Sequence, residues 1–426
     1  MNQPFKLALC VCLLAALCLA EGHPPIAIPF GSKVKLTASD GAANDQFGWS
    51  VAISSNGRVV AVGTPFHNIN GAAYVFVKSG ASWTNATQTA ELTVSNPSLA
   101  EFGDCIAITG NGDTIAVGAP GANEDQGAVY IFAATGGNPA NGYTQAAELT
   151  SSVAVLSNFG CGLAISSNGE TVAVGGGVIT NQYQGAVYVF TEPSTGWSGT
   201  VTPDATLTAS DAVANQNLGS AVSISGNTIA AGADDGFSGG LGAVYVFTKS
   251  GTNWISGTQT AKLTASDGAS LDQLGESVSI SGNTIVAGAP RHTVGSNADE
   301  GALYVFVEPA AGGWINSTQT AELTASKGGA GSFLGYSVTI RGTIVVGGAY
   351  GQQVGSNTGQ GEVFAYEKPK TGWVNRTENF NLTASGGKAG DELGWSTGIA
   401  GLVGVSGARG YSNASFVGAV YVFQAP

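Results

Sequence analysis

Short apolar runs, separated by polar and glycine-rich turns, recur along the whole chain. In the first complete unit, the run 49–54 is followed by Asn56-Gly57 and then by the apolar run 59–62. An Asn-Gly pair between two apolar runs is the strongest short signal for a β-hairpin. A longer loop leads to the run 72–77, and a Trp-bearing loop leads to 91–94. No window keeps an apolar period of 3.6 residues, so the pattern predicts four strands per unit and almost no helix.

Three sequence markers repeat seven times, at intervals close to 55–60 residues. A Phe-Gly or Leu-Gly pair begins at Phe47, Phe102, Phe159, Leu218, Leu274, Leu334 and Leu393. A segment resembling Gly-Ala-Val-Tyr-Val-Phe begins at Gly71, Gly127, Gly185, Gly242, Gly301, Gly361 and Gly418. A segment resembling Leu-Thr-Ala-Ser begins at Leu36, Leu92, Leu149, Leu207, Leu263, Leu323 and Leu382. Seven four-stranded antiparallel units predict an all-β fold, a single seven-bladed β-propeller over residues 33–426.

The two ends of the repeat region carry complementary halves of one unit. The chain enters the repeats with a fourth-strand segment at 34–39, and the last unit stops after its third strand at 419–423. Pairing these two segments would complete the last blade and protect its edge. We therefore expect the N-terminal strand to close the ring.

The Phe-Gly pair followed by Gly-Ala-Pro, as at 118–120 and 288–290, resembles the FG-GAP repeat. This resemblance implies the seven-bladed propeller found in the head of integrin α subunits. Integrin-type blades also bind Ca²⁺ through Asp-rich loops between their first two strands. The corresponding loops here, such as 55–57 and 111–113, hold too few carboxylates for the 6–8 oxygen ligands that Ca²⁺ takes. The integrin-type site is therefore not expected, although Ca²⁺ binding elsewhere stays open.

Composition narrows the function further. The chain of 426 residues has 65 Gly, 10% charged residues and a formal net charge of -13. Nucleic-acid binding needs an excess of Lys and Arg over acidic residues, so we expect no nucleic-acid partner. A protein, a glycan or a cation fits this charge better.

The first residues read as a targeting segment. Lys6 precedes an apolar stretch, 7–19, that is shorter than the roughly 20 residues of a spanning helix. We expect a signal peptide at 1–20, an N-terminal extension at 21–32, and a secreted, extracellular protein. No later segment is apolar enough to cross a membrane, and we expect a monomer. Two cysteines remain after cleavage, Cys105 and Cys161, and their positions on neighbouring blades predict a disulfide or, alternatively, two buried thiols.

Glycosylation sequons would be used if the protein is secreted, which makes it a predicted glycoprotein. The five candidates are Asn85, Asn316, Asn375, Asn381 and Asn413. Three of them follow a Trp at one phase of the repeat, although a chain rich in Ser, Thr and Asn also gains such triplets by chance.

Acidic residues gather in the loops that join one blade to the next and the second strand to the third. These loops open on one side of a propeller, which we call the loop face; the opposite side is the hairpin face. The loop face holds 14 acids against four bases, Arg291, Lys327, Lys388 and Arg409. The acids are Asp40, Asp45, Glu101, Glu124, Asp125, Asp211, Asp234, Asp235, Asp267, Asp272, Asp299, Glu300, Asp391 and Glu392. This surface predicts a platform for cations or a basic partner, or else merely solubilises the ring.

A once-per-blade tryptophan offers a second type of site. Trp83, Trp197, Trp254, Trp314 and Trp373 could stack on sugar rings, but a repeated aromatic more often packs within its blade. His67 and His292 occupy equivalent loops of distant blades and are expected at the surface. No nucleophile motif is present, and adjacent acids such as Asp391 and Glu392 are expected to stay solvated. The resulting prediction is a non-catalytic binding or adhesion module, with a propeller lectin as the alternative and a secreted enzyme third.

Overall fold

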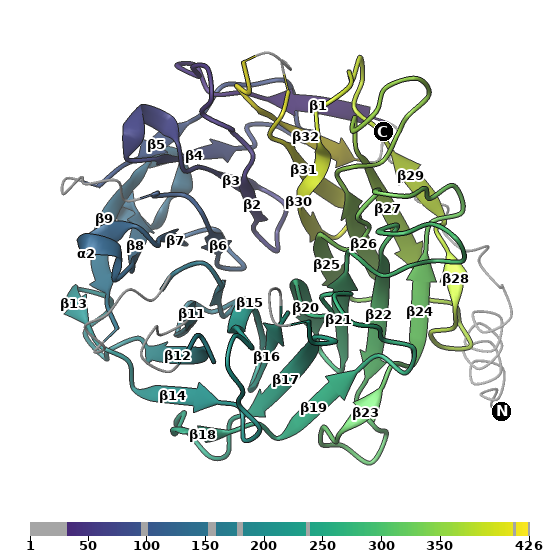
Figure 1. Cartoon of the computed structure of the whole chain (residues 1–426). Helices are drawn as coiled ribbons and strands as arrows, with labels where there is room; N and C mark the ends of the chain where they lie inside the picture. The colour runs from purple at the N-terminus through teal and green to yellow at the C-terminus, as the bar shows by residue number, and fades with distance from the viewer. Residues whose placement is uncertain are drawn as a thin grey trace, which may run out of the picture.

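Seven β-sheets stand side by side around a central opening in the computed structural model (Figure 1). The structure describes residues 32–94, 101–151, 159–176, 182–235, 239–411 and 415–424. The predicted signal peptide, residues 21–31 and Asn413 lie outside these ranges. Among the described residues, no helix is both long and apolar enough to cross a membrane. The predicted all-β, seven-bladed propeller is confirmed.

Each blade begins at the axis and adds strands outward in chain order. Blade 1 contains β2 (Ser50–Ile53), β3 (Val59–Thr64), β4 (Ala72–Val77) and β5 (Ala90–Leu92). Blade 2 contains β6 (Ile106–Ile108), β7 (Thr114–Ala119), β8 (Ala128–Ala134) and β9 (Tyr143–Leu149). Blade 3 contains β10 (Leu163–Ile165), β11 (Thr171–Gly176), β12 (Ala186–Thr191) and β14 (Ala205–Thr208). Blade 4 contains β15 (Leu218–Ser225), β16 (Thr228–Ala233), β17 (Ala243–Thr248) and β19 (Ala261–Thr264).

Blades 5 and 6 repeat this order, whereas blade 7 takes its outermost strand from the N-terminus. Blade 5 contains β20 (Ser277–Ser281), β21 (Thr284–Ala289), β22 (Ala302–Val307) and β24 (Ala321–Thr324). Blade 6 contains β25 (Ser337–Arg341), β26 (Ile344–Ala349), β27 (Glu362–Glu367) and β29 (Phe380–Leu382). Blade 7 contains β30 (Leu393–Ala400), β31 (Val403–Ala408), β32 (Ala419–Gln424) and β1 (Ser32–Leu36). Described helix is limited to α2 (Ala122–Asp125), η1 (His67–Ile69), η2 (Thr135–Gly137) and η3 (Pro139–Asn141).

The N-terminal strand closes the ring, as predicted. β1 pairs antiparallel with β32, and the register runs from Ser32 opposite Gln424 to Leu36 opposite Val420. In Figure 1 the purple β1 lies beside the yellow β32 as the outer strand of blade 7. The paired segment begins two residues earlier than the predicted 34–39 and ends at Leu36. The start and the end of the chain therefore share one sheet.

The repeated glycines are required because neighbouring blades touch there through their backbones. Each Phe-Gly or Leu-Gly pair forms a parallel bridge with the glycine that opens the third strand of the preceding blade, as Phe102 does with Gly71. The glycine of each Gly-Ala-Pro-like segment faces the next blade, and a Cβ on Gly288 would overlap the carbonyl oxygen of Gly335. The same overlap would occur at all seven blade junctions. Both sequence markers are thus contact points between blades.

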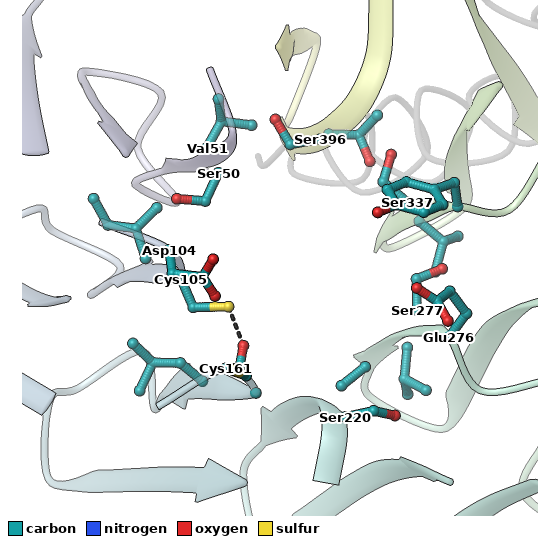
Figure 2. Close-up of a pocket in the computed structure, with 18 of the residues that line it drawn as sticks. Ser50, Val51, Asp104, Cys105, Cys161, Ser220, Glu276, Ser277, Ser337 and Ser396 are labelled. Carbon is teal, nitrogen blue, oxygen red and sulfur yellow. Dashed lines mark hydrogen bonds between the residues drawn. The ribbon is translucent and has the colours of Figure 1, made fainter. Parts of the chain in front are cut away.

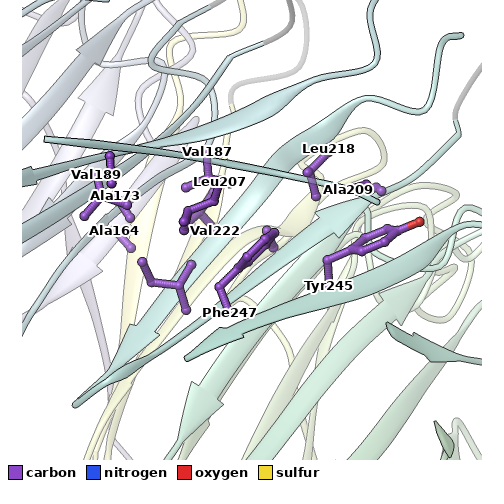
Figure 3. Packing of buried hydrophobic residues seen from close by; sticks show 14 of the residues in the cluster. Ala164, Ala173, Val187, Val189, Leu207, Ala209, Leu218, Val222, Tyr245 and Phe247 are labelled. Carbon is purple, nitrogen blue, oxygen red and sulfur yellow. The ribbon is translucent and has the colours of Figure 1, made fainter. Parts of the chain in front are cut away.

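Seven apolar clusters fill the seven junctions, and each contains residues of two adjacent blades. Figure 3 shows the junction of blades 3 and 4, where Val187 and Leu207 of one blade face Tyr245 and Phe247 of the other. The cluster between blades 7 and 1 includes Leu36, which is fully buried. Radial repetition therefore gives one continuous ring of interfaces instead of one central core.

A fifth, parallel strand extends blades 2 to 5 and was not predicted. These strands are β13 (Gly199–Val201), β18 (Gly257–Thr258), β23 (Ser317–Thr318) and β28 (Arg376–Thr377). Each comes from the following blade, and β18 pairs with β14 while β23 pairs with β19. The added strand covers the outer edge that each sheet would otherwise expose. It also ties every such blade to the next.

Candidate functional site

A cavity of about 360 Å³ lies on the propeller axis and is lined by the innermost strands of all seven blades (Figure 2). The residue directly after each Phe-Gly or Leu-Gly pair contributes to its wall. These seven residues are Trp49, Asp104, Cys161, Ser220, Glu276, Tyr336 and Trp395. All seven are half-buried, so each presents part of its side chain to the opening. Because they begin the innermost strands, they form the axial mouth of the loop face.

In four blades the next position along the innermost strand is structural. The hydroxyls of Ser50, Ser277, Ser337 and Ser396 donate to the carbonyl oxygen of the next blade's repeated glycine at 2.7–2.8 Å. These bonds hold neighbouring blades in register around the axis. The residue one position earlier, directly after the Phe-Gly or Leu-Gly pair, does not make this bond to the next blade. That freedom explains why the axial mouth carries seven side chains of mixed chemistry on a repetitive frame.

Aromatic rings form one wall of the axial mouth. The Trp395 ring centroid lies 5.2 Å from that of Trp49, 4.4 Å from Tyr336 and 5.0 Å from Tyr350. The Arg409 guanidinium lies 3.1 Å from the Trp395 ring centroid. Tyr350 and Arg409 occupy the proline position of their Gly-Ala-Pro-like segments. Two loop positions that are usually structural therefore add to this wall.

Two carboxylates of the mouth, Asp104 and Glu276, lie on opposite sides of the opening in Figure 2, and Cys161 and Ser220 complete its wall. Burial raises the pKa of Asp104 to about 6, and the charge of Glu101 adds to this shift. Burial also raises the pKa of Glu276 to about 8, supported by its hydrogen bond with Asp234 and opposed by Arg291. At neutral pH Glu276 is therefore mostly protonated, whereas Asp104 is mostly ionised.

Several predicted platform acids prove to be buried turn residues, which corrects the sequence interpretation. Asp45, Asp272 and Asp391 are 4%, 5% and 1% exposed. Each accepts a hydrogen bond from the backbone N–H three residues earlier, as Asp45 Oδ2 does from Ala42 at 2.7 Å. This pattern fixes the loop that enters the next blade. These three carboxylates are not available to a partner.

The other predicted acids divide by exposure. Asp234 and Glu300 are buried. Because Asp391 is buried as well, both adjacent acid pairs, at 234–235 and 391–392, contradict the expectation that they stay solvated. Half-buried acids are Asp235, Asp299 and Glu392, and Glu392 binds the Nε of Arg409 at 2.7 Å. The exposed set is Asp40, Glu101, Glu124, Asp125, Asp211 and Asp267. The acidic loop face is therefore smaller than the sequence suggested.

The two loop histidines are buried, contrary to prediction. His67 is 3% and His292 is 8% exposed. In each ring Nδ1 lies against a buried turn carboxylate, 2.8 Å from Asp45 and 2.7 Å from Asp272 respectively. The turn acids therefore also orient the histidines.

Four of the five repeated tryptophans are buried in their blades. Trp83, Trp254, Trp314 and Trp373 are 4–6% exposed, and Trp197 is half-buried. The Nε1 of Trp83 donates to the Gly57 carbonyl at 3.1 Å, and Trp197 does the same to Gly169. Burial leaves these four rings no face for a sugar, so the structure does not support the proposed stacking role.

The sequon asparagines lie where neighbouring blades are tied together. Asn85, Asn316 and Asn375 are exposed, and the Oδ1 of each accepts a backbone N–H of the preceding blade's outer strand at 2.8–2.9 Å. Asn381 is exposed and donates to Glu362 at 2.6 Å. This shared bond explains the common phase of three sequons. Glycan attachment stays a prediction.

Both described cysteines are free thiols on adjacent blades. The Cys105 thiol donates to the carbonyl oxygen of Cys161. Burial raises the pKa of both thiols well above the usual value, and Asp104 adds to the shift. The predicted bridge is not formed in this structure, although the two residues are neighbours as expected.

The hairpins between the first two strands do not suit the Ca²⁺ site of integrin-type blades. In blade 1 the turn is held by Ser54, whose hydroxyl donates to Asn56 Oδ1 at 2.7 Å. In blade 2 the Asn111 amide donates to Asp113 at 2.7 Å, and Asp113 is the one carboxylate there. These donor sets are too poor for Ca²⁺.

Comparison with known families agrees with this architecture. The model described as FG-GAP repeat matches residues 30–76, 86–132, 201–247, 258–306 and 317–366, more than half of the chain. The chain belongs to the FG-GAP repeat family. Blades 3 and 7 of this FG-GAP protein are largely outside the matched segments, yet they form the same junctions as the others. A search of characterised proteins found no match.

Sequence reasoning missed the axial mouth. The available signal was the residue after the constant Phe-Gly or Leu-Gly pair, which differs in nearly every repeat. The fold needs the pair for blade contacts, but it does not specify the residue that follows. Variation at one position of a regular repeat was therefore the sequence signal for the axial mouth.

Proposed function

We propose that this FG-GAP protein is a secreted, non-catalytic binding module whose loop face docks a basic segment of a protein or cell-surface partner. The observation that carries the proposal is the axial mouth, where seven mixed side chains converge on a frame that otherwise repeats. The blades of a propeller surround a central channel, and fold alone does not name the ligand. The chemistry of the mouth supplies the rest of the argument.

The mouth combines groups that favour a cationic side chain. Asp104 and the exposed Glu101 supply negative charge, and the aromatic wall supplies ring faces. A cation over an aromatic ring gains roughly 0.5–2 kcal/mol. Arg409 stacked on Trp395 shows that this wall holds a guanidinium. The exposed acids of the outer loops would steer a basic partner toward it.

Binding can be tested with nona-arginine as the cationic probe, using isothermal titration calorimetry on the purified chain. We expect binding that weakens as salt increases, because the attraction is electrostatic. Asp104→Asn and Trp395→Ala should each weaken binding about tenfold, which corresponds to roughly 1.4 kcal/mol. Glu170→Gln is the matched control, because Glu170 is an exposed acid in a strand 1–2 turn on the hairpin face.

The two variants and their control decide the proposal. Equal affinity for the parent chain and both axial variants would contradict it, as would loss of binding in the Glu170 variant alone. Cleavage of the peptide during incubation, detected by mass spectrometry, would contradict the non-catalytic part.

A glycan ligand is the second candidate. The observation in its favour is that Trp49 and Trp395, unlike the buried repeated tryptophans, are half-exposed at the axial mouth. Sugars stack on such rings and bond to neighbouring hydroxyls and carboxylates. Glycan-array binding that is lost in Trp395→Ala, without affinity for nona-arginine, would replace the first proposal with this one.

Secretion is a separate part of the proposal and rests on the apolar segment at 7–19. N-terminal sequencing of the protein from the culture medium should give Glu21 as the first residue. Recovery of the intact N-terminus inside cells would contradict it.

A further inference from the structure

A histidine and two carboxylates meet between the loops and the outer strand of blade 5. Asp267 lies in the loop entering the blade, His292 follows β21, and Glu322 belongs to β24. Their ligand atoms all lie within 4.8 Å of one another. The His292 Nε2 is 3.9 Å from Glu322 Oε1. Three possible metal ligands therefore converge from three separate segments.

Blade 1 repeats this cluster with Asp40, His67 and Glu91. The two clusters are equivalent in register, because Glu91 pairs with Tyr74 and Glu322 pairs with Tyr304 across the same two strands. Each tyrosine hydroxyl donates to Oδ1 of the loop aspartate, at 3.0 and 3.1 Å. In blade 1, the second oxygen of the aspartate faces the histidine: Asp40 Oδ2 lies 3.7 Å from His67 Nε2.

The imidazole in blade 5 is prepared to act as a ligand. His292 is more than nine-tenths buried, and Asp272 Oδ2 lies 2.7 Å from its Nδ1. A carboxylate at Nδ1 fixes the tautomer in which Nε2 carries the lone pair, the arrangement that orients histidine ligands in metal sites. Among the described residues, Nε2 has no hydrogen-bond partner. The Nε2 lone pair of a buried histidine therefore lies close to two carboxylates.

Blade 4 shows that the same place in the fold holds a cation. Lys262 stands at the register position of Glu322, opposite Tyr245. Its Nζ lies 2.6 Å from Asp211 Oδ2, while the Tyr245 hydroxyl donates to Asp211 Oδ1 at 2.9 Å. Where blade 4 has its own ammonium group, blades 1 and 5 have a carboxylate and a histidine instead.

We propose that the clusters of blades 5 and 1 bind a first-row divalent transition-metal ion, with Zn²⁺ as the representative ion. One imidazole nitrogen and two carboxylates form a three-ligand set that suits Zn²⁺ and leaves a position for water or an external ligand. Ca²⁺ would need about 6–8 oxygen ligands, more than either cluster provides. In blade 1, the amide of Asn68 donates to His67 Nε2 at 2.7 Å and competes with a metal. Blade 5 therefore binds more tightly.

The test is the number of Zn²⁺ ions bound per chain, measured by calorimetry on the purified full chain after treatment with chelator and dialysis. The expected result is two ions, with the tighter one lost in His292→Ala and the weaker one lost in His67→Ala. X-ray absorption at the zinc edge should show nitrogen and oxygen ligands only. This readout separates the clusters from the cysteine pair, which would add sulfur at about 2.3 Å.

Two further variants separate loss of metal from loss of folding. Glu322→Lys copies blade 4 by supplying an ammonium group, so it should keep the melting temperature and lose the tighter ion. Glu148→Gln changes the equivalent outer-strand position of blade 2, where no histidine follows the second strand, and should leave two ions. Absence of Zn²⁺ binding, an unchanged ion count in the histidine and Glu322 variants, or sulfur coordination would overturn the proposal.

Discussion

Closure of the ring by β1 predicts a large and specific loss of stability when its buried residues are removed. Leu36 is fully buried in the apolar cluster between blades 7 and 1, and it pairs with Val420 of β32. Replacing a fully buried leucine with alanine costs about 2–5 kcal/mol, depending on how far the cavity collapses. Deleting residues 1–39 also removes Val34, and burial of the two side chains is worth roughly 3–6 kcal/mol.

The assay is urea unfolding followed by tryptophan fluorescence. Trp83 is a local reporter, because it is buried in the same cluster and its backbone bonds with the side chain of Gln424. Leu263→Ala is the matched control: Leu263 occupies the equivalent position of blade 4, is equally buried and lies inside the chain. Leu36→Ala and Leu263→Ala should lower the urea midpoint to a similar degree.

The truncated chain should unfold at a lower urea concentration than either point variant, because an entire edge is opened. A synthetic peptide of residues 30–40 should restore part of the loss, since a ligand of the folded state stabilises it by mass action. A truncated chain with the unfolding midpoint of the full chain would refute the closure argument.

Three further predictions follow from the blade contacts and from buried groups. Gly288→Ala should lower stability by about 1–3 kcal/mol in urea unfolding, since its Cβ would overlap the next blade's backbone, whereas Gly80→Ala, in open space, should have no measurable cost. The raised pKa of Glu276, about 8, means that the folded state binds more protons than the unfolded state between about pH 4.5 and 8. Stability should therefore fall as pH rises through this window, and Glu276→Gln should flatten that slope in thermal melts from pH 5 to 9. Cys105 and Cys161 should resist iodoacetamide at pH 8 in the native protein, because burial raises the pKa of both thiols, and should react after denaturation. No reaction in either state would instead establish the predicted disulfide.

The fold was predictable because its rules are local and repeated. Phe102 and Gly71 mark one junction, and the same pair of markers recurs at every other junction. The incomplete units at 34–39 and 419–423 also required a common sheet. The fifth strands were not predictable, since Ser317 and Thr318 gain their partners only when the outer strand of the preceding blade is in place.

The site was less predictable because equivalent loop acids have different surroundings. Asp40 and Asp45 lie five residues apart in one loop, yet Asp40 is exposed and Asp45 is buried as the acceptor that holds the turn. A count of acids cannot separate these two roles. His67 was likewise predicted at the surface, because it lies in a loop and the only other loop histidine, His292, is in a distant blade; its buried partner Asp45 was not recognised. The turn pattern, with an acceptor side chain three residues after its donor, would have identified Asp45 as structural.

Under our proposal, the axial mouth of the loop face is the recognition surface of this FG-GAP protein. Hydrogen–deuterium exchange with and without nona-arginine tests it most directly, because the two faces of the propeller are sampled in one experiment. We expect slower exchange in segments around Trp49, Tyr336, Trp395 and Arg409, and no change in the turn at 167–170. Slower exchange confined to the hairpin face, or unchanged exchange throughout the bound protein, would contradict it.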